Sequence, residues 1–300
     1  MWMRHNLGRF VRKNWVGYLM LLPFFLFFVV FMVLPVLVAL CLSFTDYNMF
    51  QEMHFVGANN YKLLFLDDRI FLTALGNTFL FAVIVGPVGY IFSFFAAWVL
   101  NQLKFRNGFA LAFYAPSITS GVAMSVVWSY FFSSDSYGLI NNLLMEAGLI
   151  DTPILWTQDP SYILPVIIVV SIWMSMGTGF LVFLAGLQNV DKGYYEAAAI
   201  DGIQSKYQEL KWITLPMMKP QLLFGAITAI TNAFGVFDVA VSIAGFPSPN
   251  YAGHTIVAHL YDYAFVRFQM GYASAVATVL FLITFVIGRI VMRALSPKDE

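Results

Sequence analysis

Six long apolar runs constrain this chain more than any other feature of its sequence. Each run is about as long as the roughly 20 residues that a helix needs to cross the hydrocarbon core of a bilayer. A soluble fold of 300 residues that is 60% apolar and 11% charged would expose more apolar surface than it could bury. We therefore predict an all-α, polytopic membrane protein with six transmembrane helices. The predicted helices span residues 16–42, 77–100, 109–132, 162–187, 222–243 and 272–292.

The first apolar run follows a basic stretch, as it would in a signal peptide. Arg4, Arg9, Arg12 and Lys13 precede it. The apolar core of a signal peptide is about 7–15 residues long, and this run is much longer, so we expect an uncleaved transmembrane helix. We accordingly expect residues 1–15 to form an amino-terminal tail and residues 16–300 to form a single transmembrane domain.

The basic residues lie unevenly about the six predicted helices. The amino-terminal tail, residues 104–106, the loop 189–220 and the carboxy-terminal end hold 13 of the 16 Lys and Arg residues. Positive charge concentrates on the cytoplasmic side of a membrane protein. The count predicts a multi-pass protein of a bacterial-type inner membrane with both termini in the cytoplasm. The loops on the other side of the membrane are acidic. Either they bind an extracytoplasmic partner, or they are acidic only because basic residues concentrate on the cytoplasmic side.

The loop 189–220 is polar and carries helix signals of its own. Asp191 is a suitable N-cap, and Gly202 is a suitable stop with a positive φ. Ser205 and Gln208 have the spacing of a capping box, which predicts a second short helix that runs out at Pro216. Both helices are short enough to be marginal alone, so something must pack on them.

The sequence 197–199 of this loop consists of three alanines, which let another backbone approach closely. Two interpretations follow from the residues alone. The loop docks another protein, or it is an amphipathic segment that lies on the membrane lipid.

Glu196-Ala197-Ala198, Gly202 and Ile213-x-Leu215-Pro216 together resemble the EAA loop of permease subunits of binding-protein-dependent ABC sugar importers. In that family the loop is a coupling helix, seated in a groove of a cytoplasmic ATPase. The stretch between the glycine and the isoleucine is one residue longer than usual, and Asp191 replaces a common proline. The resemblance implies a type I ABC importer permease core. It assigns ATPase coupling to Glu196, Ala197, Ala198, Ala199, Asp201 and Gly202.

The resemblance extends over nearly the whole chain. It includes Phe55-Val56-Gly57 with Asn60-Tyr61, Pro116-Ser117 with Trp128, Leu184-Ala185-Gly186-Leu187-Gln188 and Gly271-Tyr272-Ala273-Ser274-Ala275. A glycine-rich turn usual after the fifth helix reads Ala244-Gly245-Phe246-Pro247 here. The resemblance implies a second homologous permease subunit, a cytoplasmic ATPase dimer that holds ATP and Mg, and an extracytoplasmic sugar-binding protein. The implied substrate is a sugar, an oligosaccharide or a sugar derivative.

Small and polar residues recur every three or four positions in three predicted helices, which places them on one face of each helix. Such stripes are either ordinary helix–helix contacts or the lining of a hydrated path. The stripes are Ser117, Gly121 and Ser125 in the third helix, Ser171, Ser175, Thr178, Gly179 and Gly186 in the fourth, and Thr228, Asn232, Gly235, Asp238 and Ser242 in the fifth.

Asp238 is the one charged residue well inside a predicted span, and an acid in a membrane is costly enough to indicate a function. We place it on a translocation path with Asn232, Thr228 and Ser175. Trp173 and Phe234, with Trp128 and Phe237, offer flat faces for sugar rings, although such aromatic residues also serve as plain core.

Catalytic, metal-binding and nucleotide-binding motifs are absent from the sequence. No lysine follows a glycine, so the chain has no Walker phosphate loop and is not expected to bind a cofactor itself. His254 and His259 share an outer loop, where we expect solvated side chains rather than ligands. The balanced charge gives no support for nucleic-acid binding. Two rival functions are an ion-coupled secondary transporter that uses Asp238 and an intramembrane enzyme, which would need paired acids or a metal cluster.

Overall fold

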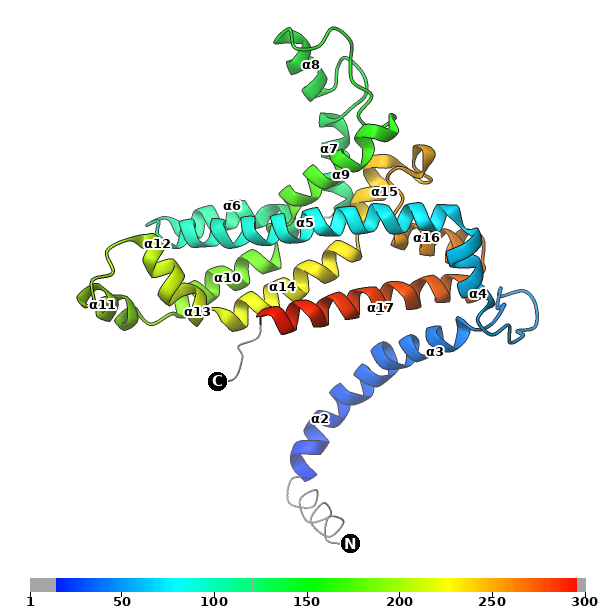
Figure 1. The fold of residues 1–300 in the computed structure, drawn as a ribbon, viewed down its shortest axis with the longest axis horizontal. Helices are drawn as coiled ribbons and strands as arrows, with labels where there is room; N and C mark the ends of the chain where they lie inside the picture. Colours follow the sequence, from blue (N-terminus) through cyan, green and yellow to red (C-terminus); the bar gives the residue numbers. More distant parts are fainter. Residues whose placement is uncertain (1–14, 120, 296–300) are drawn as a thin grey trace.

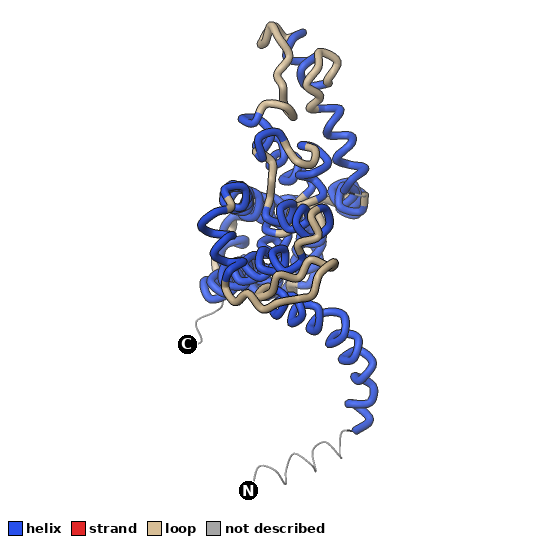
Figure 2. The backbone as a smooth tube through the Cα atoms, turned by 90° about the vertical axis from the view of Figure 1, so that its right-hand side faces the viewer, coloured by secondary structure: helices blue, strands red, loops and turns tan. Residues whose placement is uncertain are grey.

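The computed structural model describes residues 15–119 and 121–295. Within these residues, five helices are long and apolar enough to cross a membrane. Apart from a bridge between Thr45 and Phe55, the regular structure described is helical (Figures 1 and 2). The five helices are Trp15–Leu42, Arg69–Asn101, Pro160–Asn189, Lys219–Ala244 and Met270–Leu295.

The third predicted span, 109–132, is divided into two helices among the described residues, so the expected count of six is supported only approximately. It forms α6 (Arg106–Ile118) and α7 (Gly121–Phe131). Neither has the roughly 20 residues that cross a bilayer. Figure 1 shows α6 beside α5 (Arg69–Asn101), while α7 turns away from it.

A bundle of roughly parallel helices forms the main body (Figure 1). It contains α5, α10 (Thr178–Asn189), α14 (Lys219–Phe234) and α17 (Met270–Leu295). Between α5 and α10 the core is aromatic: Phe94 and Phe183 pack edge to face with ring centroids 5.6 Å apart. Edge-to-face packing adds about 0.5–1.5 kcal/mol to the stabilisation from burial of each pair.

A second group of helices stands at an angle to this bundle. It contains α7, α9 (Pro160–Met174) and α15 (Asp238–Ala244), and α8 (Leu139–Glu146) projects beyond it (Figure 1). Its core includes Ile163 and Ile167, both completely buried. Because α9 continues into α10 and α14 into α15, the two groups share the same spans.

The first span leaves the bundle. It consists of α2 (Trp15–Phe28), the π-helical turn η1 (Val29–Val33) and α3 (Leu34–Leu42), and none of its residues is buried by the rest of the chain. The wider turn precedes Pro35, which cannot donate the next helical hydrogen bond. Figure 1 shows α3 near the end of α17 and α2 diverging from it.

Three short helical segments close one end of the bundle: α4 (Asn59–Lys62) with the π turn η2 (Leu63–Asp67), the 3₁₀ turn η4 (Pro249–Tyr251), and α16 (Ile256–Tyr261) with the π turn η5 (Asp262–Val266). We call this region the outer cap. Asn60 donates from Nδ2 to the carbonyl oxygens of Ser43 and Thr45, both at 2.8 Å. Tyr61 donates to Ser43 Oγ at 2.7 Å. These bonds join α4 of the outer cap to the residues that follow α3.

Asp68 joins the outer cap to α17. Its Oδ2 accepts a 2.7 Å hydrogen bond from Tyr272 and lies 3.1 Å from His259 Nε2. Burial by itself would raise the pKa of Asp68, but the hydrogen bonds from Tyr272 and from the Phe71 amide outweigh it and hold the pKa below its usual value.

The two outer-loop histidines are buried, which corrects the expectation that they are solvated. His254 is 3% exposed and His259 is 1% exposed. Burial lowers the pKa of His254 to about 4 and also lowers the pKa of His259, so both rings are neutral at neutral pH. Among the described residues, no three side chains of the metal-binding types gather as a metal site would need.

Candidate functional site

Three spans are interrupted where the two helix groups meet. The third breaks between Ile118 and Gly121, and the fourth between Met174 and Thr178. The fifth breaks over residues 235–237, where Phe237 has φ −140° and ψ −65°. Non-helical backbone inside a membrane protein is tolerated where it is buried in protein or lines a hydrated cavity.

The three breaks touch one another through glycines. A β-carbon at Gly89 of α5 would lie 2.6 Å from Ser175 Oγ, and one at Gly177 would lie 3.0 Å from Ser117 Cβ. A β-carbon at Gly121 would lie 3.8 Å from Asp238 Cβ. A larger residue at Gly89 would force Ser175 to shift, and one at Gly177 would press closely on Ser117.

Hydroxyl groups replace part of the hydrogen bonding that the breaks remove. Ser93 Oγ donates to the carbonyl oxygen of Ser175 at 3.3 Å. Thr255 Oγ1 donates to the carbonyl oxygen of Val236 at 2.9 Å. Unpaired backbone groups are costly away from water, so these bonds stabilise the broken geometry.

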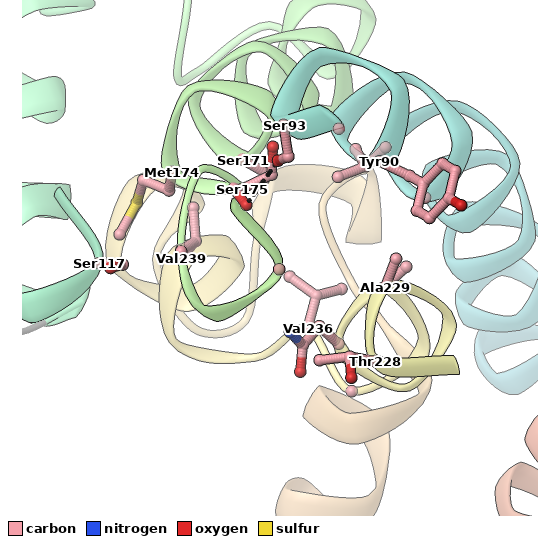
Figure 3. Close-up of a pocket in the computed structure, with 18 of the residues that line it drawn as sticks. Tyr90, Ser93, Ser117, Ser171, Met174, Ser175, Thr228, Ala229, Val236 and Val239 are labelled. Carbon is pink, nitrogen blue, oxygen red and sulfur yellow. Dashed lines mark hydrogen bonds between the residues drawn. The ribbon is translucent and has the colours of Figure 1, made fainter. Parts of the chain in front are cut away.

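A cavity of about 400 Å³ lies against the breaks. In Figure 3, Ser93, Ser171 and Ser175 lie on one side of it, and Tyr90, Thr228 and Ala229 lie on another. The Ser171 hydroxyl is buried without a hydrogen-bond partner among the described residues. The lining as a whole combines hydroxyls, one amide and one carboxylate with glycines and aromatic rings. Its other polar members are Ser117, Thr119, Asn232 and Asp238.

The structure brings four of the predicted path residues to this cavity: Thr228, Ser175, Asn232 and Asp238. It does not place them as a continuous helical face. Asp238 is the first residue of α15, after the break, rather than a residue inside one long helix. The predicted stripe on the fifth span therefore ends at the break, and Ser242 lies farther along α15, where its carbonyl accepts from Ser129.

Trp173 and Phe234 do not line the cavity, contrary to their predicted place on the path. The Trp173 ring packs against Trp128, with centroids 5.2 Å apart. Phe234 is 4% exposed and packs against Phe79, with centroids 5.6 Å apart. Phe234 therefore belongs to the core, the alternative that its residue type left open, and Trp173 is a partly buried ring packed against Trp128.

The sequence analysis missed the wall that α5 contributes. Gly86, Gly89, Tyr90 and Ser93 all line the cavity. Their spacing of three or four residues places them on one helical face, which is the same signal that we used for the third, fourth and fifth spans.

The loop 189–220 lies at the end of the bundle away from the outer cap (Figure 1). Its first helix is α11 (Lys192–Ile200), whose N-cap Asp191 accepts from the Gly193 amide at 2.8 Å. Gly202 follows with φ +92°. The predicted cap and the predicted positive-φ stop are both confirmed.

The second helix of the loop begins as predicted but ends later. Gln208 Oε1 accepts from the Ser205 amide, and Ser205 Oγ accepts from the Tyr207 amide, both at 3.3 Å. The helix does not run out at Pro216: α12 (Lys206–Glu209), the π turn η3 (Leu210–Thr214) and α13 (Leu215–Met217) follow one another. The wider turn lets the chain pass the proline, whose ring would otherwise meet the preceding turn.

Most of α11 is uncovered by the rest of the chain. Ala198 is buried, and Glu196, Ala197, Ala199, Asp201 and Gly202 are exposed. Ile200 is 87% exposed, and Tyr207 and Trp212 nearby in the loop are 68% and 62% exposed. The loop therefore presents apolar side chains and small residues outward, a combination that marks a contact surface for another protein or for the membrane.

Comparison with known families decides the identity. Residues 89–298 match the family described as binding-protein-dependent transport system inner membrane component. The chain belongs to this family. The matched range includes all three broken spans and the whole of the loop 189–220.

Relatives and solved structures resemble this inner membrane component over nearly its full length. It is 36% identical to a probable ABC transporter permease protein, YesP, of Bacillus subtilis, over 96% of this chain and 93% of the relative. It is 33% identical to the lactose transport system permease protein LacF of Rhizobium radiobacter, over 95% and 93%. Its fold matches a chain of a bacterial ABC transporter involved in the import of the acidic polysaccharide alginate. That match has a TM-score of 0.78 and 22% identity, and it covers 97% of this chain and 100% of the other.

One side-chain contact holds α11 of this inner membrane component against the rest of its loop. Tyr195 Oη lies 3.0 Å from Thr214 Oγ1, and the Thr214 hydroxyl also donates to the carbonyl oxygen of Glu209 at 3.2 Å. Thr214 is 2% exposed. The contact thus anchors the exposed helix to a buried point of η3.

Tyr195→Phe is expected to loosen α11 without unfolding the chain. Loss of one neutral hydrogen bond costs about 1 kcal/mol, which is roughly a fivefold increase in local opening. Amide hydrogen exchange over residues 192–200 measures this opening. Tyr194→Phe is the matched control, because Tyr194 is 53% exposed and no hydrogen bond of its hydroxyl occurs among the described residues. Equal exchange in the two variants would show that the Tyr195 contact does not hold α11.

Proposed function

We propose that this chain is a permease subunit of an ATP-driven importer that takes up a sugar, an oligosaccharide or a sugar derivative. The names of its relatives support this substrate class: LacF is a lactose permease, and AraP of Bacillus subtilis, 32% identical, is an arabinooligosaccharide permease. The observation that carries the proposal is the cavity, whose hydroxyls, amide and carboxylate suit a ligand rich in hydroxyl groups.

The proposed transporter has four further parts: a second homologous permease, two copies of a cytoplasmic ATPase and an extracytoplasmic sugar-binding protein. A related solved structure is an alginate ABC transporter in complex with a pentasaccharide-bound periplasmic protein, which supports the last of these. ATP and Mg bind in the ATPase dimer, and this chain binds no cofactor. Membrane lipid surrounds the apolar spans, and nucleic acid has no role.

The proposed mechanism is alternating access. Closure of the ATPase dimer on ATP moves α11, because the ATPase holds its exposed residues, while Ala198 is buried beneath them. The exposed coupling residues are Glu196, Ala197, Ala199, Asp201 and Gly202. Displacement of the loop 189–220 rocks the helices that continue from it, which are α10 and α14. Both helices end at breaks beside the cavity, so the movement reaches the substrate path directly.

Topology gives the first test. In this proposal both termini and the loop 189–220 lie in the cytoplasm. A reporter that is active only outside the cytoplasm should be active when fused near Asp151 and inactive when fused near Lys104 or Ser205. Activity at Ser205 would place the loop away from any cytoplasmic ATPase and refute the coupling role. Co-expression and purification with candidate ATPase and permease subunits would identify the partners.

An ion-coupled transporter that uses Asp238 is the second candidate function. The observation in its favour is that Asp238 lines the cavity as an isolated carboxylate. An ion-coupled mechanism gives the exposed helix α11 no role. Uptake that stops when the proton or sodium gradient is collapsed, and continues when cellular ATP is depleted, would favour this candidate over the importer.

Asp238→Asn is expected to weaken uptake while the complex still assembles in the membrane. The substitution keeps the shape and one acceptor oxygen but removes the charge. A hydrogen bond to a charged group contributes about 1.5–3 kcal/mol, so uptake at low substrate concentration should fall roughly 10- to 150-fold. Asp151→Asn, which removes the same charge from an exposed loop, should leave uptake unchanged. Reduced yield and thermal stability with normal uptake per complex would instead assign Asp238 a structural role.

A further inference from the structure

The charge on the described cavity wall is negative. Among the described lining residues, Asp238 is the charged one, and no Lys, Arg or His is present. The other polar groups of the wall are neutral hydroxyls and the amide of Asn232. A ligand in this cavity therefore meets a negative charge and no positive charge from the lining residues that the structure describes.

Asp238 has no counter-ion in the part of the chain that the structure describes. The contacts between acidic and basic side chains found there all lie outside the cavity: His54 with Asp46, Lys206 with Glu209, His259 with Asp68, and Arg267 with Asp262. No hydrogen bond to the Asp238 carboxylate occurs within residues 15–119 and 121–295 either. Its negative charge is not neutralised by a neighbouring side chain.

The neutral groups of the cavity are placed for hydroxyl-bearing ligands. The Ser171 hydroxyl is 92% buried by residue, since Ser171 is 8% exposed, and it has no hydrogen-bond partner among the described residues. Tyr90, which is partly exposed, adds an aromatic ring to the same wall. The Ser171 oxygen itself has no exposed surface, whereas the residues Ser175 and Thr228 of the same wall are partly exposed and bring their hydroxyls to the cavity.

This deepens the proposed function and rests on it: we propose that the cavity sorts saccharides by charge, accepting neutral ones and repelling those that carry carboxylate or sulfonate groups. Asp238 is the specificity-determining residue. Asp238 is exposed toward the cavity, and like charges a few ångströms apart at a protein surface repel strongly, because the effective dielectric constant there is near 20 rather than 80. We expect an anionic saccharide to bind at least about tenfold more weakly than its neutral counterpart.

The test compares two trisaccharides that share one β-1,4-linked backbone, cellotriose and the trimer of glucuronic acid. The complex is purified with its second permease and ATPase, placed in nanodiscs and studied without the binding protein, which would add its own selectivity. Saturation-transfer NMR titrations give the dissociation constant of each trisaccharide at low salt and at about 0.15 M salt, where screening reduces long-range repulsion.

Wild-type complex should bind cellotriose at least about tenfold more tightly than the uronic acid trimer. Asp238→Asn should reduce that ratio severalfold, Asp238→Glu should preserve it, and Asp151→Asn should leave it unchanged. Equal binding of the two probes by wild type, or an unchanged ratio in Asp238→Asn, would overturn charge sorting and leave the sugar-import proposal standing. Failure of the wild-type complex to bind either trisaccharide would overturn both.

Discussion

Gly202→Trp is expected to abolish uptake and the stimulation of ATP hydrolysis by the binding protein, while the protein remains in the membrane. Gly202 has φ +92°, in the left-handed region where a β-carbon is strained by roughly 1–2 kcal/mol. No other atom lies within 4 Å of the position that a β-carbon would take, so the chain itself has room for the side chain. The damage therefore comes from redirecting α11 and from placing bulk on its exposed surface.

Two controls separate these causes. Gly202→Ala introduces the backbone strain with little bulk, and it should reduce uptake less than Gly202→Trp does. Gly148→Trp is the matched position, because Gly148 also follows a short helix, has φ +67° and has no atom within 4 Å of a β-carbon. It lies in the projecting loop after α8 and should leave ATP coupling intact. Wild-type uptake in Gly202→Trp would refute the coupling role of this loop.

Gly271→Val is expected to destabilise the protein by about 3 kcal/mol, the upper part of the range for overpacking. A β-carbon at Gly271 would run into the carbonyl oxygen of Thr45, and the Gly271 amide donates a 2.8 Å hydrogen bond to the carbonyl oxygen of Tyr47. Backbone cannot move aside as a flexible side chain can. The variant should separate α17 from the residues that follow α3.

The temperature of thermal unfolding, followed by tryptophan fluorescence, and the yield of folded protein measure this effect. Gly288→Val is the control on the same helix, because no atom lies within 4 Å of a β-carbon there. It should change the unfolding temperature little. A similar decrease in unfolding temperature in both variants would mean that a valine anywhere in α17 is destabilising, and that the clash with Thr45 is not the cause.

Local features of the loop 189–220 could be predicted because short-range chemistry decides them. An aspartate cap, a serine–glutamine capping box and a positive-φ glycine each act within a few residues of their own position, and all three occur where the sequence places them. The end of the second helix could not be predicted as well, since a π turn lets the helix continue past Pro216.

The broken spans could not be predicted from hydropathy because a break does not change the average apolar character of a run. Short polar or glycine-containing sequences mark two of them, Ser-Met-Gly over 175–177 and Gly-Val-Phe over 235–237. Each break depends on partners far away in the sequence. Ser93 supports the break at Ser175, and Thr255 supports the break at Val236.

The roles of the aromatic residues could not be predicted from the sequence either. Trp173 and Phe234 have the residue types of a sugar platform, yet they pack against Trp128 and Phe79. Burial of such a ring depends on which neighbours surround it, and the spacing of residues along one helix does not specify those neighbours. The Asn60-Tyr61 and Gly271-Tyr272 motifs likewise have structural roles, since their hydrogen bonds assemble the outer cap.

The three breaks also have a mechanical consequence. Bending an intact α-helix strains or opens hydrogen bonds of its backbone, and each lost bond costs about 1 kcal/mol. At residues 175–177 and 235–237 the regular helical pattern is already interrupted, and serine and threonine hydroxyls from other helices supply part of the missing bonding. A hydroxyl can follow a small displacement by rotating about one bond. We consequently expect the backbone to bend more easily at the level of the cavity than in the intact helices that lead from it to the loop 189–220.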